Sequence, residues 1–472
     1  MSANRREILG GFGVGSAATL LWAFGCRAQL SPVRRAPQVS RDVRSWLHDA
    51  VGRLAAAYPS VHALAVSRRR TTAALDVVGP GFAQLRADGA VLTVGLSDGT
   101  RREHVTSELT ADGIAAAVQA LGAPRQAAAI DAGPAPATPD EPPAIDDRDL
   151  RHRLELLQTD ARPSSRLVYA AALIDIDDAI VWSVAPGRDL EQRRIRIRQA
   201  VTRAAWNGIR PVVADAEHAW SGWLDDQPLT PADIAAAGDA ALKLMTPGAF
   251  DDGERTVVLD PSVVAIVLDT LARGRLTAPG PRGPDPRLAS AAVTIIDDPT
   301  AAASYGGFAF DDEGEPAAPL TLVDAGRITA RLADRATGGT GRGRRPGHLA
   351  RLAPTSSHLQ LVPGAAEPNQ LYTDGLVLEA GLAASFDPAS DRIRVACGRA
   401  RELRAGNATG RVYADVELVG SLTALLAATD AVARTPTSFA VPSTADRDPT
   451  WRSISAPALR TRGLVRARRP RS

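Results

Sequence analysis

The chain is poor in lysine, cysteine and aromatic side chains, and each shortage excludes some chemistry. Lys243 is the only lysine among 55 basic residues and is followed by Leu244, so no G-K-[ST] phosphate loop exists. A Schiff base would have to use this one residue, which lies in a segment typical of a surface helix. The two cysteines, Cys26 and Cys397, form no CxxC and cannot make a four-cysteine zinc site. None of the seven histidines belongs to an HxxxH, HExxH or HExxxH motif, so no helix presents two imidazoles on one face.

The remaining composition is that of a globular protein. Apolar residues make up 45% of the 472 residues and charged residues 23%, which is enough for two or three domains with a core. Basic and acidic residues nearly cancel, 55 against 53, so the net charge gives no indication of a nucleic-acid partner.

The first 28 residues have the pattern of an export signal. Arg5 and Arg6 precede an uncharged run over residues 8–25, and paired arginines favour the twin-arginine route to the periplasm. Gly25-Cys26 resembles the end of a lipobox, which would place a lipid on Cys26 and tether the protein. Simple cleavage and an uncleaved membrane anchor are the alternatives.

Hydrophobic periodicity predicts an α+β fold with mainly antiparallel sheets. Residues 43–54 and 230–245 repeat as helices, with Thr230 as N-cap of the second. Residues 61–105 and 293–419 instead show short alternating runs between turns, as strands do. We predict a signal over 1–28, an N-terminal domain over 40–122, a Pro/Ala-rich linker or loop over 123–147, a middle region of hairpin and helices over 148–275, and a strand-rich C-terminal domain over 289–465.

An arginine row marks the predicted hairpin of the middle region. Arg194, Arg196 and Arg198 alternate with isoleucines, and Asn207-Gly208 is typical of a type I′ turn. A row of this kind fits a polyanion groove or a solvated sheet face. We favour the solvated face, because alternation alone predicts it.

Four segments raise the question of chemistry. "GLSDG" formally matches the G-x-S-x-G elbow, but no amphipathic helix follows Ser97, which favours a hairpin tip. His348 and His358 share a loop-rich region and allow a zinc site or ordinary loop histidines. The glycine-arginine run 338–349 fits a phosphate cradle or a surface loop. "FDDEG", residues 310–314, fits a metal or general-acid site or a polar turn whose acids remain hydrated.

The last of these segments carries a family resemblance. "DDPTAAASYGGFAFDDEGEP" resembles the dDP and G-x-x-x-FDDEG segments of the TldD/PmbA (TldD/TldE) family. "SSHLQLVPG" is similar to a later family stretch, with His358 where asparagine is usual, and "APALRTRGLVR" to its closing strand. The resemblance implies an α/β N-terminal domain joined to a strand-rich C-terminal domain. It also implies a relation to zinc peptidases that act on peptides and unfolded segments.

The metal motif of the TldD-type subunits is missing. In them, HExxxH follows a "vvL-x-P" strand, which here reads "TVVLDP". By this resemblance Asp269 stands at the first histidine, Thr270 at the glutamate and Gly274 at the second histidine. Ser443 falls where the family has a metal-linked cysteine. Activating water needs about three protein ligands and a base, so we expect neither catalytic residues nor bound metal in this chain.

The sequence therefore predicts an exported protein that resembles the non-catalytic PmbA/TldE type. The expected partner is either a TldD-like subunit or a second copy of this chain. Zinc is expected only in a TldD-like partner, and therefore not in a homodimer. Peptides or unfolded segments are the expected ligands, and nucleic acid is not; contact with a membrane would come from a lipid or the signal anchor. The alternatives are an active metallopeptidase or other hydrolase with an unrecognised site, and an envelope scaffold without peptide affinity.

Overall fold

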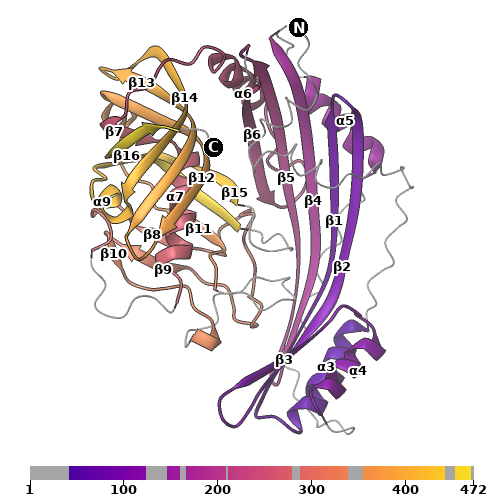
Figure 1. The fold of residues 1–472 in the computed structure, drawn as a ribbon. Helices are drawn as coiled ribbons and strands as arrows, with labels where there is room; N and C mark the ends of the chain where they lie inside the picture. The colour runs from indigo at the N-terminus through magenta and orange to yellow at the C-terminus, as the bar shows by residue number, and fades with distance from the viewer. Residues whose placement is uncertain are drawn as a thin grey trace.

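Two β-sheets, one from each half of the chain, organise the fold. A computed structural model describes residues 42–123, 146–159, 166–208, 211–278, 287–337, 354–441 and 452–468. The N-terminal half forms a long twisted sheet, and the C-terminal half forms a more rounded sheet beside it (Figure 1). The arrangement is the predicted α+β, strand-rich fold.

The first sheet is antiparallel throughout, with the order β3-β2-β1-β4-β5-β6. Its central strands are long, 19 residues each in β4 and β5. The strands are β1 (Ser60–Asp76), β2 (Gly79–Gly95), β3 (Arg101–Thr106), β4 (Leu167–Ala185), β5 (Arg188–Trp206) and β6 (Pro211–Ser221). The predicted β5–β6 hairpin is present, and its turn is described only as far as Gly208.

Helices cover one face of this sheet. The helices α3 (Val43–Ala55) and α4 (Ala111–Ala120) pack against one end of β1 and β2, around Leu47 and Leu92. At the other end, α5 (Asp147–Thr159) and α6 (Pro231–Lys243) pack near Trp220. The predicted cap of α6 is confirmed: Thr230 accepts from the Asp233 amide, and Asp233 completes a capping box.

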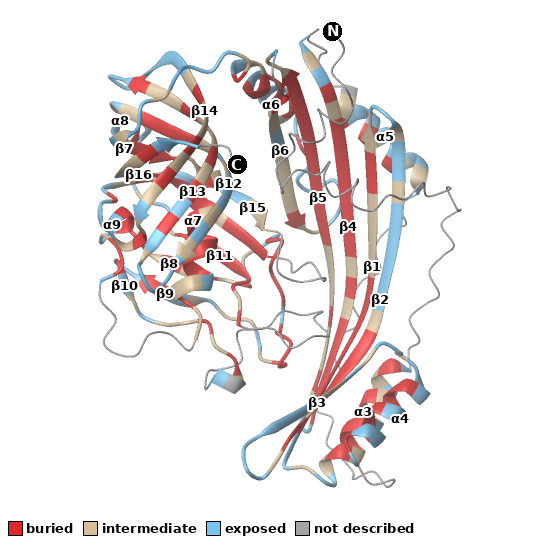
Figure 2. Cartoon of the chain, in the orientation of Figure 1, coloured by how far each residue is buried: buried red, intermediate tan, exposed pale blue. Residues whose placement is uncertain are grey.

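The opposite face of the sheet is turned toward the second half of the chain. Because side chains alternate along a strand, the residues of β1, β4 and β5 that are not under the helices form a second set of rows. These rows are also buried, as the red colour along both central strands shows (Figure 2). Arg188, Gln192 and Arg196 of β5 contact the second half from this face.

The second sheet is mixed and nearly closes on itself. Its order is β10-β9-β8-β11-β16-β14-β13-β12-β7, and β16 also pairs with β7, so five strands form a ring. β15 lies outside the ring on β16. The strands are β7 (Gly253–Leu259), β8 (Ile295–Asp297), β9 (Leu320–Asp324), β10 (Arg327–Ile328), β11 (His358–Leu361), β12 (Gly375–Asp387), β13 (Arg392–Arg404), β14 (Asn407–Ser421), β15 (Ala431–Val441) and β16 (Arg452–Ala467).

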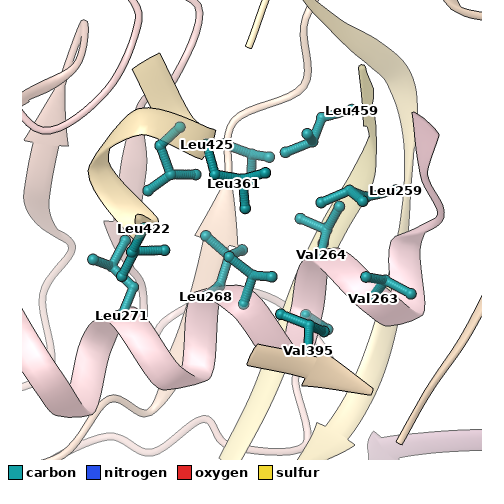
Figure 3. Close-up of a cluster of buried hydrophobic side chains, with 14 of the residues drawn as sticks. Leu259, Val263, Val264, Leu268, Leu271, Leu361, Val395, Leu422, Leu425 and Leu459 are labelled. Carbon is teal, nitrogen blue, oxygen red and sulfur yellow. The ribbon is translucent and has the colours of Figure 1, made fainter. Parts of the chain in front are cut away.

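Helix α7 (Pro261–Arg275) is the centre of this second domain. Its valines and leucines pack in the main hydrophobic core with side chains from β7, β11, β13 and β16 and from the short helix α9 (Leu422–Ala427) (Figure 3). A helix that is apolar nearly all round is expected to be buried in this way. The remaining short elements are η1 (Arg335–Thr337) and α8 (Pro368–Leu371).

The structure divides the chain differently from the predicted middle region over 148–275. Strands β4–β6 of that region pair with β1–β3, whereas β7 and α7 belong to the second sheet. The sequence could not reveal this, because pairing between strands that are distant in sequence leaves no local pattern. Among the described residues, no helix combines the length and apolarity needed to cross a bilayer.

Candidate functional site

Helix α7 carries the three positions at which the family resemblance places the zinc motif. The strand β7 runs directly into it, and the side chain of Asp260 caps its start by accepting from the Val263 amide at 2.9 Å. Pro261 occupies the first turn, where its missing N–H is not needed. The predicted strand-to-helix frame is therefore present, and the question is what its side chains can do.

Asp269 is held by two arginines. Its side chain lies in the core of the domain, and one oxygen accepts from Arg452 at the start of β16, a residue only 4% exposed. The other oxygen lies 2.8 Å from Arg273, one turn along the helix. Both carboxylate oxygens are therefore engaged with guanidinium groups.

The other two positions offer no ligand. Thr270 is buried, and its hydroxyl oxygen has no hydrogen-bond partner. Gly274 lies against the ring of Phe386 from β12, so that a Cβ at this position would fall 2.4 Å from a ring carbon. Arg275 stacks over the same ring, 5.8 Å from its centre. A histidine side chain at 274 would have to displace Phe386.

These residues do not fit the zinc ion that the fold family implies. The acid is already neutralised by arginine, the hydroxyl is a poor ligand and the glycine has no side chain. In the part of the chain that the structure describes, no group of three His, Cys, Asp or Glu side chains is placed to hold a metal. Ser443, at the family's cysteine position, lies outside the described residues, as do Arg5, Arg6 and Cys26 of the signal.

The FDDEG turn lies at the contact between the two domains. Asp311 accepts through its Oδ1 from the amides of Glu313 and Glu315, both at 2.9 Å, and Gly314 takes the left-handed conformation at φ 73°. Arg188 of β5 donates to the Gly314 carbonyl at 2.7 Å. A tight polar turn was one of the two predictions for this segment, and the structure contains it.

The expectation that the acids of this turn stay hydrated is wrong. Asp311, Asp312 and Glu313 are each at most 3% exposed. The turn belongs to the second domain and packs against the sheet of the first domain, where it contacts β5. Burial, together with the neighbouring charges of Glu313 and Glu315, raises the pKa of Asp311 to about 7. The second oxygen of Asp311 has no hydrogen-bond partner.

Side chains of β5 hold the main chain that leads to this turn. The amide of Gln192 donates to the Phe310 carbonyl at 2.9 Å and accepts from the Ala309 amide at 2.8 Å. Further along the same face of β5, Arg196 donates to the carbonyl of Tyr305 at 3.0 Å and to that of Gly307 at 3.4 Å. These contacts bind backbone atoms, so they fix the position of the segment independently of its side chains.

The arginine row of β5 is therefore not the solvated face that we predicted. Arg196 is 2% exposed, and Arg198 is 9% exposed and paired with Glu217 of β6 at 2.8 Å. Burial lowers the pKa of Arg196 to about 10. Alternation showed correctly that the row shares one face, but a second domain, not water, covers that face.

His358 is part of a buried network beside the contact between the two domains, which we call the seam. Its Nδ1 lies 2.8 Å from the hydroxyl of Ser453, and that hydroxyl accepts from the Gly306 amide at 2.9 Å. Burial lowers the pKa of His358 to about 4, so the ring is neutral at pH 7. A Cβ on Gly306 would lie 1.9 Å from the Ser357 carbonyl oxygen, which explains why glycine stands at the start of the G-x-x-x-FDDEG segment.

The remaining sequence candidates carry no site among the described residues. Ser97 lies at the tip of the β2–β3 hairpin, as predicted, where the Gly99 amide donates to the Leu96 carbonyl. His348 and the rest of the glycine-arginine run over 338–349 lie outside the described part.

Three residues that matter here escaped the sequence reasoning: Arg452, Phe386 and Gln192. Each acts on a partner more than 100 residues away, and no local pattern marks any of them.

The second sheet with its central helix α7 is similar to a domain of known proteins. Residues 252–467 match the family model of the PmbA/TldA metallopeptidase C-terminal domain. This part of the chain is therefore similar to the C-terminal domain of the TldD/PmbA family. A protein named "Metalloprotease" from Methanothermobacter thermautotrophicus is 31% identical over 110 residues, 21% of this chain and 24% of the relative. The match thus spans about a quarter of that relative's length.

Solved structures show the same fold over nearly the whole chain. TldE from Thermococcus kodakarensis matches with a TM-score of 0.69 at 14% identity, over 90% of this chain and 100% of that one. A Thermotoga maritima protein solved as a candidate modulator of a DNA gyrase matches with a TM-score of 0.68 at 15% identity, over 86% of this chain and 96% of that one. At such identities the likeness concerns the fold alone.

Proposed function

We propose that this chain is an exported, non-catalytic member of the TldD/PmbA family that holds extended peptide segments without cleaving them. The observation that carries the proposal is the state of α7: Asp269 is neutralised by Arg452, and Gly274 is covered by Phe386. Activated water needs a cation with free ligands and a base beside it. Neither is available at these positions.

Two strand edges support peptide binding. Among the described strands, β6 pairs only with β5, and β15 pairs with β16 apart from one bridge at Ala433. These two edges lie close together where the two domains meet (Figure 1). An extended peptide can add to such an edge through backbone hydrogen bonds, which tolerate many sequences.

The export and partner parts of the proposal are supported by the sequence. Arg5 and Arg6 before the uncharged run favour the twin-arginine route and a periplasmic location, with a lipid on Cys26 as one means of tethering. A zinc-bearing TldD-like subunit is the natural partner for a chain that lacks the motif, and a homodimer is the alternative. Light scattering of the purified chain, alone and mixed with an HExxxH-bearing family subunit, separates the two.

Zinc content and peptide turnover test the central claim. We expect the purified mature chain to contain far less than one zinc per molecule and to bind an unstructured fluorescent peptide without cleaving it. Stoichiometric zinc with cleavage that a chelator abolishes would establish the active metallopeptidase instead. Metal-independent cleavage would indicate a hydrolase with an unrecognised site, and the absence of binding to any extended peptide would favour a scaffold.

Adjacent proline substitutions locate the peptide. Thr437 and Ser438 of β15 are exposed, and their amides point to opposite sides of the strand. Proline removes one backbone donor, so one variant loses a hydrogen bond to β16 and the other a donor at the free edge. We expect one of Thr437→Pro and Ser438→Pro to lose peptide binding while its unfolding midpoint stays near that of the wild type. If neither variant does so, the β15 edge is not the site.

A further inference from the structure

A buried ion pair joins the central helix to the last strand of the ring. Asp269 of α7 and Arg452 of β16 are 183 residues apart in sequence, and their side chains are 8% and 5% exposed. Taking two charges out of water is costly, so each partner needs the other. Arg273 contributes a second contact to the same carboxylate, but its own side chain is 51% exposed. Arg452 is therefore the buried counter-charge.

The next turn of the helix is joined to a different strand. Gly274 leaves room for the ring of Phe386 from β12, and Arg275 lies over that ring and donates to Asp391 at 2.8 Å. Within two helical turns, α7 is thus fixed to both β16 and β12. Asp269 and Gly274, two of the three positions that the family resemblance assigns to the zinc motif, are thus engaged in contacts within the domain.

We propose that the Asp269–Arg452 pair and the Gly274–Phe386 contact form a metal-free joint, in which the guanidinium supplies the positive charge that a bound cation would otherwise supply to this helix. The inference rests on the proposed function in so far as the chain holds no zinc at α7. It goes further by stating that these residues act as a unit and that the joint, not a metal, fixes α7 in the ring.

The joint has a consequence that a chance contact lacks. Removing Asp269 leaves Arg452 buried without its carboxylate, and removing Arg452 leaves Asp269 with only the half-exposed Arg273, whereas removing both leaves no buried charge to compensate. The two single variants should therefore each be more damaging than their combination. A contact that contributes little would give small, additive changes.

A double-mutant cycle on the full mature chain tests this. We expect Asp269→Asn and Arg452→Met each to lower the thermal midpoint by about 5–10 °C, and the double variant to recover at least half of that loss. If a single variant does not accumulate as folded protein, recovery of folded protein in the double variant is the readout. The exposed pair Arg394–Glu417, 3.3 Å apart in the same sheet, is the matched control, and Arg394→Met should shift the midpoint by less than about 2 °C.

Additive single variants, or a double variant worse than either one, would overturn the joint. A rise of the wild-type midpoint on adding zinc, or a fall on adding a chelator, would also overturn it. Failure of the cycle in a chain that still binds and does not cleave peptide would leave the proposed function standing. Cleavage that depends on zinc would instead remove the proposed function itself.

Discussion

Substituting Asp311 by asparagine should change how the stability of this protein depends on pH. Asp311 is 1% exposed in the seam between the domains, and burial beside Glu313 and Glu315 raises its pKa from the ordinary value of 3.8 to about 7. The raised pKa means that folding disfavours the charged form. The cost is therefore fully present above about pH 8, shrinks as pH falls through the folded pKa, and is absent below about pH 4.

The magnitude follows from the shift. One pKa unit corresponds to about 1.4 kcal/mol, so a shift of about three units costs about 4 kcal/mol of unfolding free energy above pH 8. Between pH 8 and pH 5 the wild type should regain about 2.5 kcal/mol of this cost. An asparagine side chain is neutral at every pH and keeps an oxygen to accept from the amides of Glu313 and Glu315. The Asp311→Asn variant should therefore lack this gain.

Denaturant titrations of wild type and Asp311→Asn at pH 5, 6, 7 and 8 measure the effect. The difference between the two proteins matters more than either curve, because other groups also titrate. His358, whose pKa burial lowers to about 4, destabilises the fold as pH falls below about 6.5 in both proteins. The asparagine variant should be the more stable at pH 8, with an advantage that shrinks toward pH 5. Parallel curves would refute the assigned cause of the pKa shift.

Three further substitutions or measurements test the seam. In a denaturant titration, Phe310→Ala should lower the unfolding free energy by about 3–5 kcal/mol, because the Phe310 residue is 4% exposed in a cluster between the domains. Leu85 is 59% exposed, so the control Leu85→Ala should change the unfolding free energy by less than about 0.5 kcal/mol. Gly306→Ala should cost about 1–3 kcal/mol because its Cβ would collide with a carbonyl oxygen, while Gly81→Ala, with open space around it, should not; equal midpoints would contradict this packing. In an NMR titration His358 should stay neutral down to about pH 4, and a midpoint near 6.5 would show that it is exposed to water.

Local patterns predicted much of this protein because their causes are local. The cap of α6 at Thr230, the helix after "TVVLDP" and the hairpin tip at Ser97 each depend on residues a few positions apart. The tight FDDEG turn depends on Gly314 in the same way. The absence of HExxxH is likewise a property of the chain itself, and it already argued against metal chemistry.

Tertiary structure alone decided the environments. Whether Arg196 faces water or another domain depends on which surface packs against β5, and the alternating sequence is the same in both cases. From the sequence, Asp269 could be a weak metal ligand. In the structure, Arg452, 183 residues away, makes it one half of an ion pair. Burial changes the cost of a charge by several kcal/mol, and burial comes from contacts between distant segments. The sequence therefore determined which groups this protein has, and the packing of its two sheets determined their charge and their partners.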